Sequence, residues 1–416
     1  MFRKSNTQPQ LDVFGSVPSL LEGAASKQFH DENHWHNKFY NHVISRIDET
    51  IFRVLFNETM GAPNAPISKL IGMMILKDAF GWSDAQLYEQ CRFNLLTRAA
   101  LGLFNINDSI PTESTYYLLR DRIYKHQLKT GEDLLEKTFA TLTRGQIQEF
   151  DVDGRAIRMD SKLIGSNIAF FTRYEIVHQT LCQFYKTLDK ASLMRLPASF
   201  QEQLKTIVSE ESSKTVYRST KEEIVSRLAS YGGIIYTLIN TFSDHTSVQY
   251  RLLRRVFNEQ YKVAENEQIE VRPKEEITSG SVQSPHDPDC AYRNKNETPV
   301  KGYSVNLTET ISEDSLNLIT NVTVKKANAS DSEFVQPSIT KTIGVSGQPV
   351  EKVYVDGAYQ SPANDEFCED MEMVFGGLQG ADPRYDLEMT DEGLLVTDTI
   401  TGEIQQAVLS KPRKRS

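Results

Sequence analysis

Two short stretches decide the fold that this sequence predicts: residues 158–167, RMDSKLIGSN, and residues 353–364, VYVDGAYQSPAN. In the first, apolar and polar side chains alternate, as they do along a half-buried strand. In the second, an apolar run ends at an aspartate followed by glycine. Asp160 therefore points away from the apolar side of its strand, beside Arg158. We expect both stretches to lie in one sheet, with Asp160 and Asp356 as neighbours.

The chain between these stretches changes its pattern twice. Residues 171–265 have helical spacing, clearest in YEIVHQTLCQFYKTL and KEEIVSRLASYGGIIYTLINTF, and a polar connector follows them. Strand patterning returns in GYSVNLTETI and LNLITNVTVKKA, before a short helix from Asp331 to about residue 342. Alternation around Val-Asp-Gly at 152–154 predicts a hairpin within residues 145–168, and GLLVTDTITGEI near the C-terminal end predicts another.

The sequence before residue 150 is typical of helices. Ser68 is expected to cap one helix, Gly81 to end it, and Ser83 to cap the next. Pro111 and Thr112 open a further helix. Strands on both sides of a helical block predict an α/β fold with a mixed sheet, a helical insertion and an all-helical N-terminal domain. We expect a flexible N-terminal segment at 1–35, a helical domain at 36–144, a core at 145–170 and 286–416, and a helical insertion and connector at 171–285.

The charge of the chain is uneven. Its 416 residues carry a net charge of −10, but residues 351–410 hold 14 acidic and two basic side chains, and KPRKRS at the end adds four positive charges. The first 350 residues are thus near neutrality and can carry basic patches. No run of 18 apolar residues exists, the first residues lack the apolar part of a secretory signal, and the four cysteines are far apart. We therefore expect reduced thiols, a cytoplasmic location and no membrane partner.

Asp160 and Asp356 are the candidates for chemistry, because carboxylates at strand ends beside small residues are open to hard cations such as Mg²⁺. The alternative is that each is a solvated turn or cap residue. The Asp153-Gly154 pair is better explained as a turn. His30, His34 and His36 lack the partners of a recognised zinc pattern and favour packing. The sequence has no P-loop, no GxGxxG after a strand and no GxSxG.

Four stretches together resemble the DDE transposases of bacterial insertion sequences, in the insertion-sequence-five-like group with a helical N-terminal domain. They are SKLIGMMILKDAFGWSDAQLYEQCRFNLLTRAALGL with IPTESTYYLLRDRI, then RMDSKLIGSN, then HDPDCAYRNKNETPVKGYSVNLTET, and finally VYVDGAYQSPAN with its Asp-x-x-Tyr. The resemblance covers roughly residues 35–375. It implies that the helical domain at 36–144 binds DNA. It also implies a ribonuclease-H-like core, in which Asp160 and Asp356 are catalytic and bind metal, with two Mg²⁺ ions expected and Mn²⁺ as a substitute.

The family's third carboxylate is a Glu on a downstream helix, and this sequence departs from the family there. Glu366, Glu369 and Glu372 follow Asp356 too closely. Glu388, Glu392 and Glu403 lie in sequence that predicts loops or a hairpin. The sequence therefore predicts a copy truncated at its C-terminal end, which is expected to be at best feebly active because the third metal ligand is missing.

The resemblance implies metal-dependent cleavage at transposon ends and strand transfer into target DNA. The alternative is a truncated, inactive remnant that only binds transposon-end DNA; a nuclease unrelated to transposition is a weaker reading. Expected partners are double-stranded DNA, both transposon ends and target, and a second copy in a homodimer assembled on DNA, at the bacterial nucleoid. The expected DNA contacts are Arg92, Arg98, Arg120, Arg122, Lys125, Lys162, Lys295 and Lys301.

Overall fold

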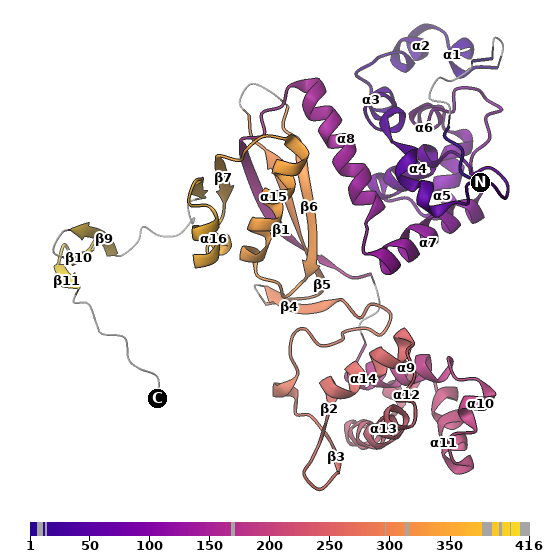
Figure 1. The fold of residues 1–416 in the computed structure, drawn as a ribbon, viewed down its shortest axis with the longest axis vertical. Coiled ribbons are helices and arrows are strands. Elements are labelled where there is room, and N and C mark those ends of the chain that lie inside the picture. Colours follow the sequence, from indigo (N-terminus) through magenta and orange to yellow (C-terminus); the bar gives the residue numbers. More distant parts are fainter. Residues whose placement is uncertain are drawn as a thin grey trace.

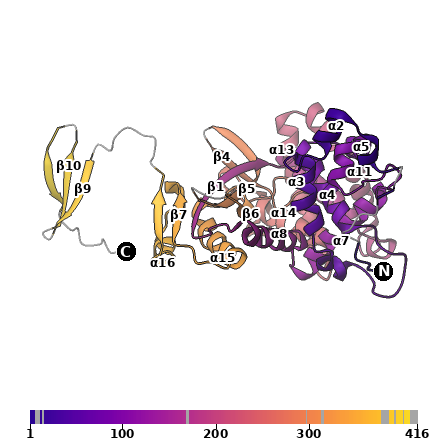
Figure 2. The same ribbon diagram turned by 90° about the horizontal axis from the view of Figure 1, so that it is seen from above.

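The computed structural model describes residues 1–5, 11–12, 15–167, 171–295, 297–312, 316–376, 385–390, 393–399 and 401–407. The protein belongs to the α/β class, with a mixed sheet between two groups of helices (Figure 1). One group precedes the sheet in the chain and the other is inserted between its first two strands. A small three-stranded sheet stands apart at the C-terminal end (Figures 1 and 2).

The N-terminal helical group packs around apolar side chains that include Phe52 and Met73, both fully buried. As expected, Ser83 caps α5 in a capping box and Gly81, at φ +65°, ends α4. The expectation for Ser68 is wrong: α4 begins after Pro66, and the N–H of Ser68 donates to the buried carboxylate of Glu49 at 2.8 Å. The elements are α1 (Val17–Leu20), α2 (Gly23–Phe29), α3 (Trp35–His42), η1 (Ile44–Arg46), η2 (Glu49–Leu55), α4 (Ile67–Phe80), α5 (Asp84–Phe93), α6 (Leu95–Ala100), α7 (Glu113–Thr130) and α8 (Leu134–Phe150).

The expected hairpin around residues 152–154 is wrong, because α8 continues to Phe150. Asp151 then adopts a left-handed conformation at φ 48° and ends the helix. Ile147 and Val152 pack together against Val345, so the apolar spacing reflects a helix end and its following residue. Asp153 accepts hydrogen bonds from Arg155 beside it, and the strand begins at residue 156. The alternating pattern belongs to β1, and the sequence-based prediction extended it back into the last turn of α8.

The mixed sheet contains strands from both predicted parts of the core, residues 145–170 and 286–416. Its strand order is β6-β5-β1-β7-β8, with β4 pairing along the first part of β5. β5 is antiparallel to β1 and to β6, whereas β7 is parallel to β1 and β8 is parallel to β7. The strands are β1 (Ala156–Gly165), β4 (Ala291–Lys295), β5 (Thr298–Thr310), β6 (Ile319–Lys326), β7 (Lys352–Val355) and β8 (Glu372–Phe375).

One face of this sheet is covered by α15 (Val335–Ser346), which follows η4 (Asp331–Phe334) (Figure 2). Ile157 and Met159 of β1 are buried there with Ile339 of α15 and Val353 of β7. Arg158, Asp160 and Lys162 alternate with these residues and are exposed. Sequence periodicity therefore assigned the two faces of β1 correctly.

The structure explains why the Lys-Gly-Tyr segment has a glycine at residue 302. It lies opposite Gly165 in the β1–β5 pairing. A Cβ atom at residue 302 would stand 2.0 Å from the carbonyl oxygen of Ile164. Such a contact is impossible without moving β1, so the close approach of the two strands requires glycine.

The inserted helical group has its own core, which includes Tyr174, Leu253 and Phe242. Its two ends meet: the guanidinium of Arg173 donates to the side chain of Gln260 at 2.6 Å and to its carbonyl at 2.9 Å. The elements are α9 (Arg173–Tyr185), α10 (Lys190–Leu193), α11 (Ala198–Ser209), α12 (Ser212–Arg218), α13 (Lys221–Thr241), α14 (Val248–Gln260), β2 (Tyr261–Val263), β3 (Ile269–Val271) and η3 (Lys274–Glu276).

The remaining elements follow β7. η5 (Gly357–Tyr359) and α16 (Pro362–Phe367) precede β8. The small sheet contains β9 (Tyr385–Thr390), β10 (Gly393–Asp398) and β11 (Ile404–Ala407), all antiparallel. The pairing of β10 with β11 confirms the hairpin predicted from GLLVTDTITGEI. The KPRKRS segment lies outside the described residues.

Candidate active site

Asp160 lies on β1, and Asp356 directly follows the end of the neighbouring parallel strand β7. The register pairs Arg158 with Tyr354, and each aspartate comes two residues later in its own chain segment. Neighbouring strands are about 4.8 Å apart, so this register brings Asp356, just past the end of β7, toward Asp160. Residue 356 keeps an extended backbone (φ −86°, ψ 170°), and side chains alternate along strands, so both carboxylates belong to the outward face.

The Asp160 carboxylate is not engaged by neighbouring cations. Arg158, on the same face, instead forms an ion pair with Glu309 of β5 at 2.7 Å. Within the residues that the structure describes, the Asp160 side chain has no hydrogen bond or ion pair. Asp356 accepts one hydrogen bond, from the N–H of Ala358 at 2.9 Å. Both side chains are exposed, so ligand oxygens are available on one open surface.

A buried tyrosine fixes the turn after Asp356. Tyr359 is 1% exposed, and its hydroxyl donates to Oδ1 of Asn306 on β5 at 2.7 Å. Burial raises the pKa of the Tyr359 phenol, and the charges of Asp331, Asp160 and Asp356 raise it further. The Asp-x-x-Tyr spacing thus has a structural cause, because the tyrosine anchors the aspartate's turn to a neighbouring strand.

A second buried group supports the strand that carries Asp160. Ser161, the next residue, points to the opposite face and donates its hydroxyl to Oδ1 of Asp331 at 2.7 Å. Asp331 is 7% exposed, and its other oxygen lies 3.8 Å from Nη2 of Arg293 on β4. Sequence reasoning missed Asp331 as a site residue, since 170 positions separate it from Ser161 and only the start of a helix was visible there.

The described part of the chain does not bring a third carboxylate together with Asp160 and Asp356. No group of three or more His, Cys, Asp or Glu side chains there could hold a metal ion. Glu372 forms an ion pair with Lys352 at 2.9 Å. Glu366 lies on α16 and Glu369 in the turn after it, while Glu388 lies on β9 of the small sheet and Glu403 directly before β11. Glu392 lies outside the described residues.

The histidines form a packing cluster. His36 is fully buried, and its Nε2 donates to the carbonyl of Phe29 at 3.0 Å. Its Nδ1 must then accept the hydrogen from Nδ1 of His34, 2.8 Å away, because neutral imidazole has one donor and one acceptor. Burial lowers the pKa of His36, and the neighbouring His34 contributes in the same direction. The buried position of His36 therefore favours its neutral ring.

The expected DNA contacts on the N-terminal helices differ in their surroundings. Arg92 on α5 and Arg120 and Lys125 on α7 are exposed. Arg92 lies over the ring of Tyr88, and Lys125 forms an ion pair with Asp121.

Arg98 has a different role from the one the sequence suggested. It is 5% exposed, and its guanidinium donates to the carbonyls of Cys91, Asn105, Ile106 and Asp108. A buried arginine that satisfies four carbonyls holds the turn after α6 in place and does not face solvent. We therefore remove Arg98 from the expected phosphate contacts.

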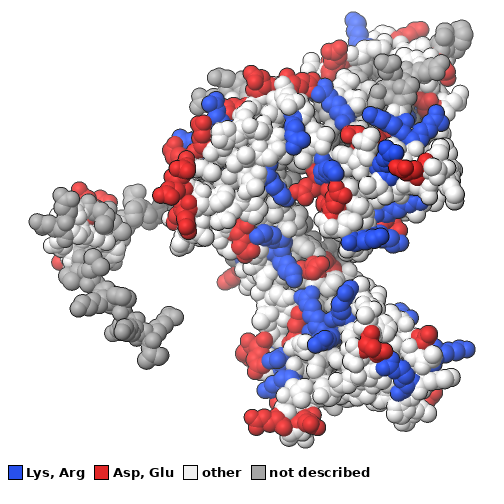
Figure 3. Space-filling model, viewed as in Figure 1, with Lys and Arg blue, Asp and Glu red and all other residues white. Residues whose placement is uncertain are grey.

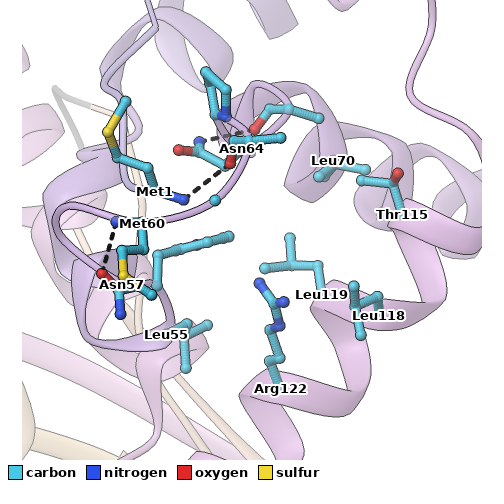
Figure 4. A pocket seen from close by; sticks show the side chains of 15 residues that line it. Met1, Leu55, Asn57, Met60, Asn64, Leu70, Thr115, Leu118, Leu119 and Arg122 are labelled. Atoms are coloured by element: carbon cyan, nitrogen blue, oxygen red, sulfur yellow. Dashed lines mark hydrogen bonds between the residues drawn. The ribbon is translucent and has the colours of Figure 1, made fainter.

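Arg122 projects into a hollow of about 640 Å³ (Figure 4). Leu55, Met60 and Leu119 supply apolar walls, and the guanidinium lies over the ring of Phe56, 5.1 Å from its centre. Figure 4 shows the Arg122 side chain pointing into this hollow from α7. The Arg122 guanidinium is thus partly enclosed, whereas the Arg120 side chain is exposed.

The three lysines near the sheet also differ. Lys162 is exposed two residues after Asp160, on the same face of β1. Lys295 is exposed at the end of β4. Lys301 is half-buried, and its Nζ donates to the carbonyl of Phe171 at 3.4 Å. Burial lowers the pKa of Lys301, so it belongs to the packing between the sheet and the inserted helices.

Comparison with known proteins gives one family match. Residues 26–122 match the family model described as Transposase domain (DUF772). This match covers the N-terminal helices from α2 into α7 and supports a transposase of the insertion-sequence type. Searches of the curated proteins and of the solved structures found no significant match. Among the described residues, no helix has both the length and the apolar character needed to cross a membrane.

Proposed function

We propose that the protein is a DDE-type transposase that cuts DNA at the ends of an insertion sequence and joins them to target DNA. The observation that carries this proposal is the pair Asp160, on β1, and Asp356, directly after the adjacent parallel strand β7. β1, β5 and β6 run antiparallel to one another in sheet order, and after α15 the strands β7 and β8 run parallel to β1. This order supports a ribonuclease-H-like core. The transposase match at residues 26–122 supports the same reading from a different part of the chain.

The residues present suit a hard divalent cation. Asp160 and Asp356 supply carboxylate oxygens on an open surface, and Mg²⁺ binds through one or two carboxylates while keeping several waters. Mn²⁺ accepts the same ligands. Bound there, the ion would polarise the phosphodiester and favour a nucleophilic water or hydroxyl. The described residues place two carboxylates, which fits one ion; a second ion requires a further ligand.

The proposed reaction has two balanced displacements at phosphorus. In the first, the oxygen of water bonds to phosphorus at the element's end, the bond to the 3′ oxygen breaks, and that oxygen leaves as a 3′-hydroxyl. In the second, this hydroxyl attacks a target phosphodiester and the target's own 3′ oxygen departs. Lys162, beside Asp160 and without an ion pair among the described residues, is placed to bind a phosphate oxygen.

Double-stranded DNA is the proposed partner, both as transposon end and as target. Arg92, Arg120 and Lys125 remain the proposed phosphate contacts of the N-terminal helices, since all three are exposed. Phosphate contacts make binding fall steeply with salt concentration. Assembly of two copies on DNA is part of the proposal, because each copy would hold one end.

The test is cleavage of a plasmid that carries the element's ends, with Mg²⁺ or Mn²⁺. We expect nicking by the wild-type chain and none by Asp160→Asn or Asp356→Asn. Glu369→Gln is the control, because it removes an exposed carboxylate, in the turn between α16 and β8, that the mechanism does not use. Cleavage that survives both aspartate substitutions would refute the proposal. Specific binding of the ends without cleavage would favour the binding-only alternative.

A further inference from the structure

The exposed face of α14 is the feature that the proposed function leaves unexplained. This helix buries Tyr250, Leu253, Val256 and Phe257 in the core of the inserted group. Its opposite face carries Arg251, Arg254, Arg255 and Asn258, spaced so that they lie on one stripe of the helix. We call these four residues the α14 arginine face.

Two of the three arginines on this face have no acidic partner among the described residues, unlike several arginines elsewhere in the inserted group. Arg195, Arg227 and Arg272 of the same group each form an ion pair with an acidic side chain. Arg251 and Arg254 are exposed, and within the described residues their guanidinium groups have no ion pair or hydrogen bond. A solvated helix face usually mixes both signs of charge, whereas this stripe holds cations and an amide.

Arg255 fixes the arginine face relative to the sheet. Its guanidinium pairs with Glu259 at 2.7 Å and donates to the carbonyls of Pro288 at 2.8 Å and Gly280 at 3.1 Å. The segment that it holds leads into β4. The four residues of the face, with Glu259, also line a shallow hollow. Figure 3 shows basic side chains gathered where the lower helical group meets the rest of the molecule, the region in which Figure 1 places α14.

We propose that the α14 arginine face binds backbone phosphates of double-stranded DNA, so that the inserted group is a second DNA-binding surface beside the N-terminal helices. The inference rests on the proposed transposase function, which supplies the DNA. Arg251 and Arg254 are free to bind phosphate oxygens with two donors each, and a helix of 13 residues is long enough to lie along a groove. Asn258 adds a donor and an acceptor at the far end of the stripe.

The experiment measures binding of the full chain to a fluorescent DNA duplex without divalent ions, across a range of salt concentrations. Arg251→Ala combined with Arg254→Ala should weaken binding about tenfold at low salt and lower the salt slope by about 2, as expected for two lost phosphate contacts. Arg251→Lys with Arg254→Lys should restore most of the slope, because the positive charge remains. A thermal melt of each variant checks that the inserted group stays folded.

The matched control is Lys205→Ala combined with Lys214→Ala. These lysines lie in the same helical group, but Lys205 pairs with Glu202 on α11 and Lys214 with Glu211 at the N-cap of α12, so their loss should leave both affinity and slope unchanged. If wild-type chain binds DNA and the double arginine variant binds it equally well, the arginine face is not a DNA surface, although the transposase proposal stands. If an acidic peptide competes at this face while DNA does not, the partner is a protein segment and the inference fails. Absence of any DNA affinity in the wild-type chain would overturn both proposals.

Discussion

Tyr359 and Asn306 share a buried hydrogen bond of 2.7 Å that ties the turn after Asp356 to strand β5. The amide of Asn306 also donates to Ser338 of α15, so the same side chain links the turn, the strand and the covering helix. The position of the second aspartate therefore depends on a contact between residues 53 positions apart.

Tyr359→Phe should destabilise the protein by about 1–3 kcal/mol, because it leaves the Asn306 oxygen buried without its donor. Urea unfolding of the full chain measures this change. Tyr217→Phe serves as the control, since Tyr217 is 91% exposed and its substitution should change the free energy of unfolding by less than about 0.5 kcal/mol. Equal stability of the two variants would contradict the assigned contact.

Asp160→Asn and Asp356→Asn should each weaken Mn²⁺ binding about tenfold or more, since each removes one of two charged ligands. Electron paramagnetic resonance of free Mn²⁺ gives the bound fraction without any need for DNA. Both side chains are exposed, so the melting temperature of the metal-free chain should stay close to that of the wild type. If both variants bind Mn²⁺ with the affinity of the wild type, Asp160 and Asp356 do not form the metal site.

The stability of the N-terminal helices should fall as the pH drops below about 6.5, where a histidine in the unfolded chain begins to bind a proton. The pKa of His36 is lowered by burial, so the folded state resists protonation and the unfolded state gains protons first. The loss grows until the pH passes the lowered pKa of folded His36. Unfolding free energies between pH 7.5 and 5 should show this slope in the wild type and in the exposed-residue control His30→Gln, but a flatter one in His36→Gln.

Arg98→Ala should destabilise the chain by about 3 kcal/mol or more, because four carbonyls lose a charged donor in a buried place. Arg92→Ala should change stability by less than about 0.5 kcal/mol and instead lower the salt slope of DNA binding by about 1. Measuring both properties on both variants separates packing from phosphate contact. A stable Arg98→Ala chain with weakened DNA binding would restore the original assignment of Arg98.

The two aspartate strands could be predicted because alternation and strand ends are local signals. Alternation identified the exposed face of β1, and the apolar run before Asp356 marked β7 correctly. The same signal failed at 145–154, where the last turn of α8 and Val152 imitate a strand although a left-handed Asp151 separates helix from strand. The sequence could not show that Arg98 is buried, since its acceptors are backbone carbonyls whose direction depends on the fold.

The support behind the site could not be read from the sequence either. Ser161 and Asp331 are joined across 170 positions, and neither residue stands in a pattern that links them. The Asp-x-x-Tyr spacing was visible, but the partner of Tyr359 was not. Residues that position the aspartates are thus found through long-range pairing, whereas the aspartates themselves are found through local pattern.

The contact of Arg173 with Gln260 bears on the order in which the chain assembles. β1 ends at Gly165, and its antiparallel partner β5 begins only at Thr298, so pairing them in an extended chain means closing a long loop. Because Arg173 and Gln260 join the two ends of the inserted helices, early collapse of those helices shortens the effective loop. The shorter loop lowers the entropic cost of loop closure by about 1 kcal/mol. The inserted helices thus hold β1 and β5 close together in the chain, and loss of the Arg173–Gln260 contact should slow refolding.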